Sequence, residues 1–335
     1  RRGSETVTEL YTGAGRRMRE FGGYIEIEHY KGNEYHTGCL ALNSGRNCLR
    51  YLIRARQIRK IMLPRLQCQV IEEVCRREGV QIQWYEVKAL EKPYQDEQLE
   101  EEVFLYLINY YGQLEKNYLE KLLAGHKRVI VDNAQDFFCG PIEGVDTIYT
   151  CRKFFGVPDG AYLYTDAQAD FTLQADFSYD RMEFLLGRYE CGAEKFYQNY
   201  RENEAWMDKQ GLSAMSALTH NILRSIDYER VEQTRTSNAK RLDAGLGENN
   251  LLTVKNMTGA YLYPYFCADG EKLRKKLIER KIFVPVLWQN VLEDCDIDTA
   301  EYNFSKNMVP LPCDQRYTEN DMDEVIAAVK ELEER

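Results

Sequence analysis

The sequence predicts an α/β fold in which a mostly parallel central sheet, covered by helices, is followed by a smaller C-terminal α/β domain. From residue 38 onward, short apolar runs alternate with helical patterns, and this alternation is typical of parallel strands joined by crossover helices. The chain has 335 residues, more than one hydrophobic core usually organises, so we expect two domains. We place the large domain, including the N-terminal segment, at residues 1–237 and the small C-terminal domain at residues 238–335.

The elements of the large domain follow in order along the chain. Residues 22–28 alternate polar and apolar side chains, which is typical of a half-buried strand. Apolar runs predict further strands at residues 39–42, 60–63, 81–87, 103–109, 128–132, 145–150 and 161–165, with helices from the turn at 43–47 to about residue 56 and after Pro64 to about residue 78. Residues 212–246 show helical periodicity and are expected to form one long helix between the domains.

The remaining elements belong to the small domain. Residues 260–266 and 283–286 are expected to be strands, and residues 271–280 and those from about 320 onward are expected to be helices. No internal repeat or low-complexity linker divides the chain, so the domain boundary depends on the change of pattern along the long helix.

Composition argues against several classes of function. The formal net charge of -10 makes general nucleic-acid binding unexpected, and no apolar run approaches the roughly 18–20 residues of a membrane span. The ten cysteines include no Cys-x-x-Cys pair and no tight His/Cys cluster, so no metal site is expected. Free cysteines and the lack of an apolar signal core after Arg1 predict a cytoplasmic protein. Because residue 1 is not Met, the question whether further residues precede it stays open.

The first candidate segment lies where a predicted strand ends and a helix begins. Ser44 and Gly45 form the turn, and Arg46 and Asn47 stand in the first turn of the helix. Free backbone N–H groups and the helix dipole make such a position an anion site suited to a phosphate. The alternative is an ordinary helix N-cap, because Asn and Ser are favoured caps.

The second segment follows a buried strand. Asp132 loses its hydration there unless it has a partner, and a protonated pyridine nitrogen is such a partner, since the ion pair keeps the ring cationic. Gln135 stands three residues later, within reach of a phenolic oxygen on the same ring. The alternative is that Asp132 caps the next helix and that Gln135 lies on the surface.

The third segment carries one lysine between a strand and a turn that contains Gly and Pro. Partial burial would lower the pKa of Lys153, and an unprotonated amine is what Schiff-base chemistry requires. Thr150 offers a hydroxyl to a phosphate, with Arg152 as a weaker candidate. Taken alone, Lys153 is more simply explained as a solvated turn residue.

In this order and spacing, the three segments resemble fold-type I enzymes that use pyridoxal 5′-phosphate (PLP), specifically a divergent branch of the DegT/DnrJ-type sugar aminotransferase family. The resemblance covers roughly residues 20–335 and extends to residues 109–113, to 215–235, similar to the family's long interdomain helix, and to 309–312. It implies that Lys153 forms the Schiff base, that Asp132 holds the pyridine nitrogen, and that residues 1–237 form the large PLP-binding domain.

The resemblance also implies an activity. In the family, an amino group passes from an amino acid such as glutamate to a keto-sugar, often nucleotide-linked, in a homodimer with each site at the subunit interface. Two alternatives stay open: a lyase or dehydratase of the same fold, although dehydratase relatives lack the Schiff-base lysine, and a catalytically inactive relative that binds a sugar or a protein partner. A nucleotide-binding dehydrogenase is not expected, because Gly-x-Gly-x-x-Gly is absent after the first strand.

The sequence departs from the family pattern at two places. The position of the family's aromatic ring over the cofactor, counted from Pro64, falls on Cys68, whose thiol stacks less well than an aromatic ring. The family's Ser-Phe-His run before the lysine is replaced by residues 148–152. Both departures indicate a divergent branch whose substrate cannot be inherited from the family.

Candidate substrate contacts are Tyr24, His36 and Arg316. The first two would reach the pocket if the N-terminal segment folded over it, and a structural role is the alternative for each. Arg316 offers a planar fork that matches the carboxylate of an amino donor, and pairing with Asp314 is the alternative. Glu28, Tyr35 and residues 288–290 are further candidates of the same kind.

Overall fold

A sheet of nine strands forms the main body of the protein in the computed structural model, which describes residues 21–95 and 99–334. The strand order is β3-β2-β4-β5-β6-β7-β1-β9-β8. The strands are β1 (Leu40–Leu42), β2 (Lys60–Pro64), β3 (Gln81–Tyr85), β4 (Phe104–Ile108), β5 (Val129–Asp132), β6 (Asp146–Thr150), β7 (Ala161–Tyr164), β8 (Gln174–Ala175) and β9 (Ser213–Ala214). The run from β3 to β6 in this order is parallel, and β7 is antiparallel to both β6 and β1.

The parallel strands are buried because helices cover the sheet. Every residue of β4 and β5 is buried, as expected for strands enclosed on both faces. The helices beside this part of the sheet are α1 (Gly45–Ala55), α2 (Gln69–Arg77) and α3 (Lys116–Gly125). Apolar side chains of α1 and α2 join those of the strands in one core. The predicted mostly parallel sheet is therefore confirmed.

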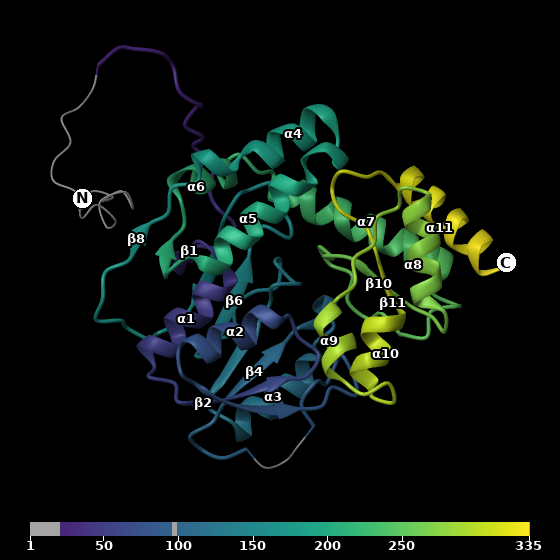
Figure 1. Cartoon of the computed structure of the whole chain (residues 1–335), viewed down its shortest axis with the longest axis horizontal. Helices are drawn as coiled ribbons and strands as arrows, with labels where there is room; N and C mark the ends of the chain where they lie inside the picture. The colour runs from purple at the N-terminus through teal and green to yellow at the C-terminus, as the bar shows by residue number, and fades with distance from the viewer. Residues whose placement is uncertain (1–20, 96–98, 335) are drawn as a thin grey trace.

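The C-terminal part of the chain has a core of its own, beside the large sheet (Figure 1). Its two antiparallel strands are β10 (Tyr263–Phe266) and β11 (Met308–Leu311). The helices of this part are α7 (Tyr228–Leu246), α8 (Gly270–Glu279), α9 (Gln289–Asp294), α10 (Ala300–Asn307) and α11 (Glu319–Glu333). A small C-terminal α/β unit agrees with expectation, and the boundary between residues 237 and 238 stays a prediction.

The remaining α-helices lie along the chain between β8 and α7. They are α4 (Glu183–Cys191), α5 (Tyr197–Lys209) and α6 (Ala217–Leu223), with short 3₁₀ turns at Tyr110–Gly112, Tyr179–Arg181 and Glu194–Phe196. In Figure 1 these three α-helices lie together above the sheet. No helix in the described part of the chain is long and apolar enough to cross a membrane, and the described residues hold no cluster of three or more His, Cys, Asp or Glu suited to a metal ion.

Three predicted elements are wrong. Residues 22–28 and 283–286 form no strand, because alternation of side chains predicts a strand only where a partner strand is available to complete its hydrogen bonds. The long helix predicted at 212–246 is divided into β9, α6 and α7. Helix α6 begins at Ser216 and α7 at Asp227, whose side chains accept the backbone N–H groups of Thr219 and Arg230. These caps stop the helix although the apolar periodicity continues.

Candidate active site

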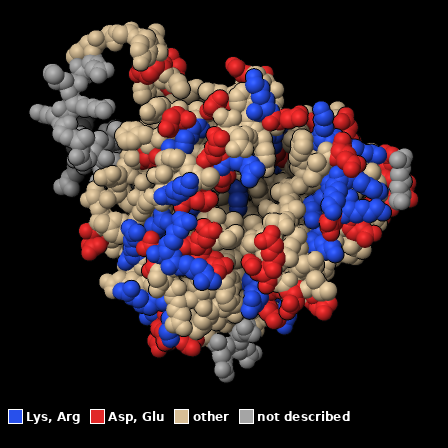
Figure 2. Space-filling model, viewed as in Figure 1, with Lys and Arg blue, Asp and Glu red and all other residues tan. Residues whose placement is uncertain are grey.

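A cavity of about 790 Å³ lies between the large sheet and the C-terminal elements, and Figure 2 shows that this face of the molecule is hollowed near its middle. Strands β1, β5 and β6 point the same way, because β7 is antiparallel to both β1 and β6 and β5 is parallel to β6. Their carboxyl ends therefore meet at one edge, where ligands of open α/β sheets bind. The predicted site residues that line the cavity are Ser44, Gly45, Arg46, Cys68, Asp132, Gln135, Thr150, Lys153 and Arg316.

The turn before α1 has the features of an anion site. Ser44 is the N-cap residue in an extended conformation, and its side chain makes no capping hydrogen bond. The first backbone N–H groups of the helix, including those of Gly45 and Arg46, lack partners within the helix and carry its positive dipole end. A Cβ atom placed on Gly45 would come no closer than 3.9 Å to the side chain of Ile148. Gly45 thus leaves room at the helix end rather than relieving a strained turn.

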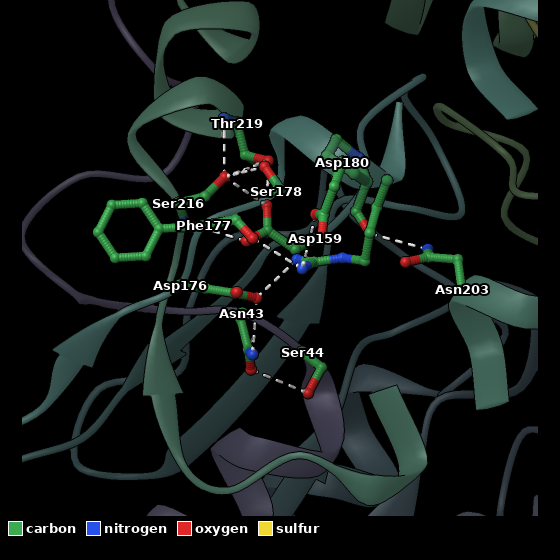
Figure 3. Close-up of polar contacts among 12 residues, drawn as sticks. Asn43, Ser44, Asp159, Asp176, Phe177, Ser178, Asp180, Asn203, Ser216 and Thr219 are labelled. Carbon is green, nitrogen blue, oxygen red and sulfur yellow. Dashed lines mark hydrogen bonds and ion pairs between the residues drawn. The ribbon is translucent and has the colours of Figure 1, made fainter. Parts of the chain in front are cut away.

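A buried polar network holds this turn in place (Figure 3). Asn43 donates its amide to Asp176 Oδ2 at 3.0 Å, and its own carbonyl oxygen accepts the Ser44 hydroxyl at 3.3 Å and the Asn47 amide at 2.6 Å. Arg181 pairs with Asp176 at 2.8 Å, and the two side chains are only 7% and 6% exposed. Asn47 therefore lies behind the turn as part of its support and does not line the cavity.

The same network extends to the start of β7 and to α6. Asp159 accepts the backbone N–H and the hydroxyl of Ser216 at 2.9 and 3.0 Å, and also the hydroxyl of Thr219. Burial raises the pKa of Asp159, although these hydrogen bonds oppose the shift. Gly160, with a φ of +117°, leaves space for Thr219 and donates its N–H to Asn43 O at 2.7 Å. The loop after the lysine and the turn before α1 are thus tied together.

Two arginines line the cavity beside this turn and are paired with acids of α5. Arg46 forms ion pairs with Glu204 and Asp208, and Arg152 forms one with Glu204. Burial lowers the pKa of Arg152 to about 10. Its Nε is buried and has no hydrogen-bond partner among the described residues. An unpaired donor in a cavity fits a site that takes an anion.

Asp132 ends β5 at the wall of the cavity and is 8% exposed. Its Oδ1 accepts the N–H of Ala134 at 2.8 Å, and its Oδ2 accepts the hydroxyl of Tyr106 at 2.8 Å. The side-chain carbonyl of Gln135 accepts the N–H of Tyr111 at 2.9 Å. Because this bond occupies the carbonyl oxygen of the Gln135 side chain, the NH₂ group is the end that remains able to donate to a ligand in the cavity.

Lys153 follows β6 and lines the same cavity as Asp132. Its side chain is accessible to solvent through the cavity. The protein atoms packed around the cavity nevertheless reduce the hydration of the amine and lower its pKa, while the negative charge of Asp132 opposes this shift. Its Nζ lies 5.5 Å from the ring centre of Tyr261. A lysine in such surroundings loses its proton more readily than one on the surface.

The C-terminal part supplies the opposite wall. Arg316 reaches the cavity, but its guanidinium makes a two-pronged pair with Asp314 at 2.7 and 2.8 Å. Trp288 also lines the cavity. The two N-terminal candidates do not: Tyr24 is 94% exposed, and His36 is buried among aromatic rings, where its Nε2 lies 2.8 Å from the carbonyl of Phe137. Burial lowers the pKa of His36 to about 4, so this imidazole stays neutral.

Several residues of the cavity carry no signal in the sequence. They include Tyr106 in the middle of β4, Arg188 on α4, Tyr200 and Glu204 on α5, and Tyr261 before β10. None of these belongs to a strand end or a glycine turn, which are the features that marked the other candidates. Only the register of β4 on β5, with Tyr106 opposite Ile130, would have placed Tyr106 near Asp132.

Comparison with known proteins connects this geometry to one class of structure. No protein-family model matches the chain, and no curated protein matches it. Among solved structures, DesV from S. venezuelae in complex with a ketimine intermediate is 16% identical, with 89% of this chain and 85% of DesV covered and a TM-score of 0.64. The sugar aminotransferase CalS13 from Micromonospora echinospora is 15% identical, with 88% and 87% covered and a TM-score of 0.58.

NtdA from Bacillus subtilis, solved with bound cofactor PMP, is 13% identical, with 89% of this chain and 73% of NtdA covered and a TM-score of 0.63. A DegT DnrJ EryC1 StrS aminotransferase from Brucella abortus is similar as well. The chain therefore has the fold of these aminotransferases, as the resemblance in its sequence implied. At these identities the likeness establishes the fold, and the roles of the individual site residues stay predictions.

Proposed function

We propose that the chain is a PLP-dependent aminotransferase in which Lys153 carries the cofactor. One observation supports this most: an amine of lowered pKa, a buried carboxylate and the N-terminus of α1 line a single cavity. PLP has three matching parts, an aldehyde, a pyridine nitrogen and a phosphate. When bound, it supplies an electron sink that makes the α-carbon proton of an amino acid removable.

Each residue would have a distinct task. Asp132 would hold the proton on the pyridine nitrogen, and the Gln135 amide would donate to the phenolic oxygen. The first N–H groups of α1, with Ser44, Thr150, Arg46 and Arg152, would hold the phosphate. The Lys153 amine, freed when the amino donor binds, would take the proton from the donor's α-carbon and deliver it to the cofactor carbon that carried the aldehyde.

For the substrates, we propose an amino acid such as glutamate as donor and a keto-sugar, nucleotide-linked as in the family, as acceptor. Support comes from the sugar aminotransferase CalS13, which shares the fold, and from the cavity of about 790 Å³, which lies at the upper end of the usual range for ligand pockets. Arg316 would bind the donor's carboxylate by giving up its pair with Asp314. Cys68 would lie against the cofactor ring.

The test is a visible absorbance spectrum of the full chain purified with PLP, followed by borohydride reduction and peptide mass mapping. We expect a yellow protein whose reduced pyridoxyl mass is on Lys153, and no label in Lys153→Ala. Lys281→Ala is the matched control, because Lys281 lines the same cavity and its loss should leave the label in place. A colourless protein that cannot be reconstituted, or a label on another lysine, contradicts the proposal and favours the inactive relative.

The second enzyme class is separated by the amino-donor half-reaction. Addition of glutamate to an aminotransferase should exhaust the yellow colour once per site and release one equivalent of 2-oxoglutarate, with colour restored by a keto acceptor. A lyase would instead regain its colour without an acceptor and release product continuously.

A further inference from the structure

Tyr106 touches the carboxylate that the proposed site depends on. It lies in β4 opposite Ile130 of β5, and Asp132 is two residues further along β5. Because side chains alternate along a strand, Tyr106 and Asp132 project from the same face of the sheet. The Tyr106 hydroxyl donates to Asp132 Oδ2 at 2.8 Å, and both residues line the cavity.

From this contact we infer that Tyr106 is a positioning residue, which orients the Asp132 carboxylate toward the place that the pyridine nitrogen would take. The inference rests on the proposed function. The Ala134 N–H holds Oδ1 and the Tyr106 hydroxyl holds Oδ2, so the plane of the carboxylate is fixed from two sides. Each oxygen keeps a further lone pair for a ligand.

The tyrosine ring is itself fixed. Tyr106 has no exposed surface, and its backbone carbonyl accepts the hydroxyl of Tyr85 at 2.9 Å. A fully buried aromatic ring between strands and helices has little freedom to change its rotamer. The hydroxyl is therefore presented to Asp132 without the loss of entropy that a mobile side chain would bring.

The charges around the hydroxyl agree with a permanent donor. Burial raises the pKa of Tyr106 well above its ordinary value, and the charge of Asp132 raises it further. The other titratable groups that act on it are Cys48 of α1 and Cys75 of α2. Burial raises the pKa of both thiols, that of Cys75 to about 12, so both stay neutral. The charge of Asp132 also acts on Lys153, which lines the same cavity.

Tyr106→Phe should therefore change the site without changing its shape. Without the Tyr106 hydroxyl, the Asp132 carboxylate would be free to turn away from the pyridine nitrogen, and the nitrogen would hold its proton less firmly without this negative charge beside it. We expect roughly tenfold weaker binding of PLP, as for other hydrogen bonds to charged groups. With less positive charge on the ring, the pH midpoint of the visible absorbance of the bound cofactor should move upward.

The experiment is a double-mutant cycle on the full chain. PLP affinity and the pH midpoint are measured for the wild type, Tyr106→Phe, Asp132→Asn and the double variant. If Tyr106 acts through Asp132, its substitution should weaken PLP binding only while Asp132 is present. Tyr263→Phe is the matched control: this buried tyrosine also donates to an aspartate, Asp243, at 2.8 Å, but in the C-terminal core, so PLP affinity should not change.

The outcomes separate the inference from the proposed function. A wild type that binds PLP while Tyr106→Phe matches it in affinity and midpoint overturns the inference alone, as does an equal loss in both backgrounds. A wild type that binds no PLP overturns both. If Tyr106→Phe fails to fold, 3-fluorotyrosine at position 106 keeps the shape and strengthens the donor, and the midpoint should then move downward; an unchanged midpoint would again contradict the inference.

Discussion

At the scale of single residues, burial sets the protonation of several side chains near the site. Asp136 follows Gln135 and accepts the Asn109 amide at 3.1 Å. Burial raises its pKa from 3.8 to about 7. The folded state therefore binds this proton more tightly than the unfolded chain does. Between about pH 4 and about pH 7 the contribution of Asp136 to stability falls as the pH rises, and above that range it is constant.

We predict that Asp136→Asn removes this fall. The amide stays neutral at every pH and can still accept from Asn109. The free energy of unfolding of the variant, relative to that of the wild type, should therefore rise by on the order of 1–3 kcal/mol between pH 4 and pH 8. Urea unfolding at a series of pH values measures the difference. Asp298→Asn, at an exposed position, is the control and should parallel the wild type. A wild-type slope retained in Asp136→Asn would contradict the prediction.

Burial also affects the two arginines of the cavity, whose positive charges are each paired with an acid. Arg152 and Arg46 share Glu204 as a partner, so neither has lost its counter-charge on burial. Uncompensated burial of a guanidinium would be strongly destabilising. The pairs with α5 therefore allow two arginines to stand beside the proposed phosphate position before any ligand arrives.

At the scale of elements, capping side chains determine where the connection between the two parts of the chain bends. Helices α6 and α7 meet between Leu223 and Tyr228, where Asp227 caps α7 by accepting the N–H of Arg230 at 3.1 Å. The bend directs α7 to the C-terminal core, while α6 stays with the network around Asp159. A single straight helix could not contact both the C-terminal core and the network around Asp159.

We predict that Asp227→Ala lowers the free energy of unfolding by about 1 kcal/mol, the usual effect of losing an N-cap. The measurement is a urea unfolding curve at neutral pH. Glu248→Ala removes an acidic side chain at an exposed position without removing a cap, and its unfolding midpoint should match the wild type. Equal stability of Asp227→Ala and the wild type would show that the cap does not determine the bend.

At the scale of the whole molecule, the N-terminal segment exposes large apolar side chains. Phe21, Tyr24 and Ile25 are 83%, 94% and 89% exposed. The segment is held to α6 by Asn221, which accepts the Tyr30 N–H at 2.9 Å and donates to Glu28 O at 2.8 Å. Exposed apolar side chains that lie close together commonly mark contacts between proteins, and they agree with the homodimer that the family resemblance implies.

We predict that light scattering after size-exclusion chromatography gives twice the mass of one chain. Replacement of Phe21, Tyr24 and Ile25 by Ser should shift the protein toward the monomer, because the apolar contact would be lost. Ile297→Ser is the control: Ile297 is 72% exposed but lies far along the chain, and its loss should leave the dimer intact. A wild-type monomer at micromolar concentration would contradict the proposed assembly.

The positions of strands β1 to β7 and of helices α1 and α2 along the chain can be predicted from the sequence alone, as can the three segments that meet at the cavity. These features are local: a strand, a turn and a polar residue at the strand's end are read from neighbouring positions. The topology of parallel strands then brings Ser44, Asp132 and Lys153 to one edge. For this reason the core of the candidate site could be predicted without coordinates.

Which residues complete the site, and which stay away from it, depends on contacts that form only in the folded chain. Tyr106 meets Asp132 through strand register, Glu204 meets Arg152 across more than fifty positions of sequence, and His36 is enclosed by aromatic rings from distant segments. The predicted strand at residues 22–28 failed for the same reason. Such contacts depend on what packs against a segment, and the pattern within the segment carries no information about its neighbours in space.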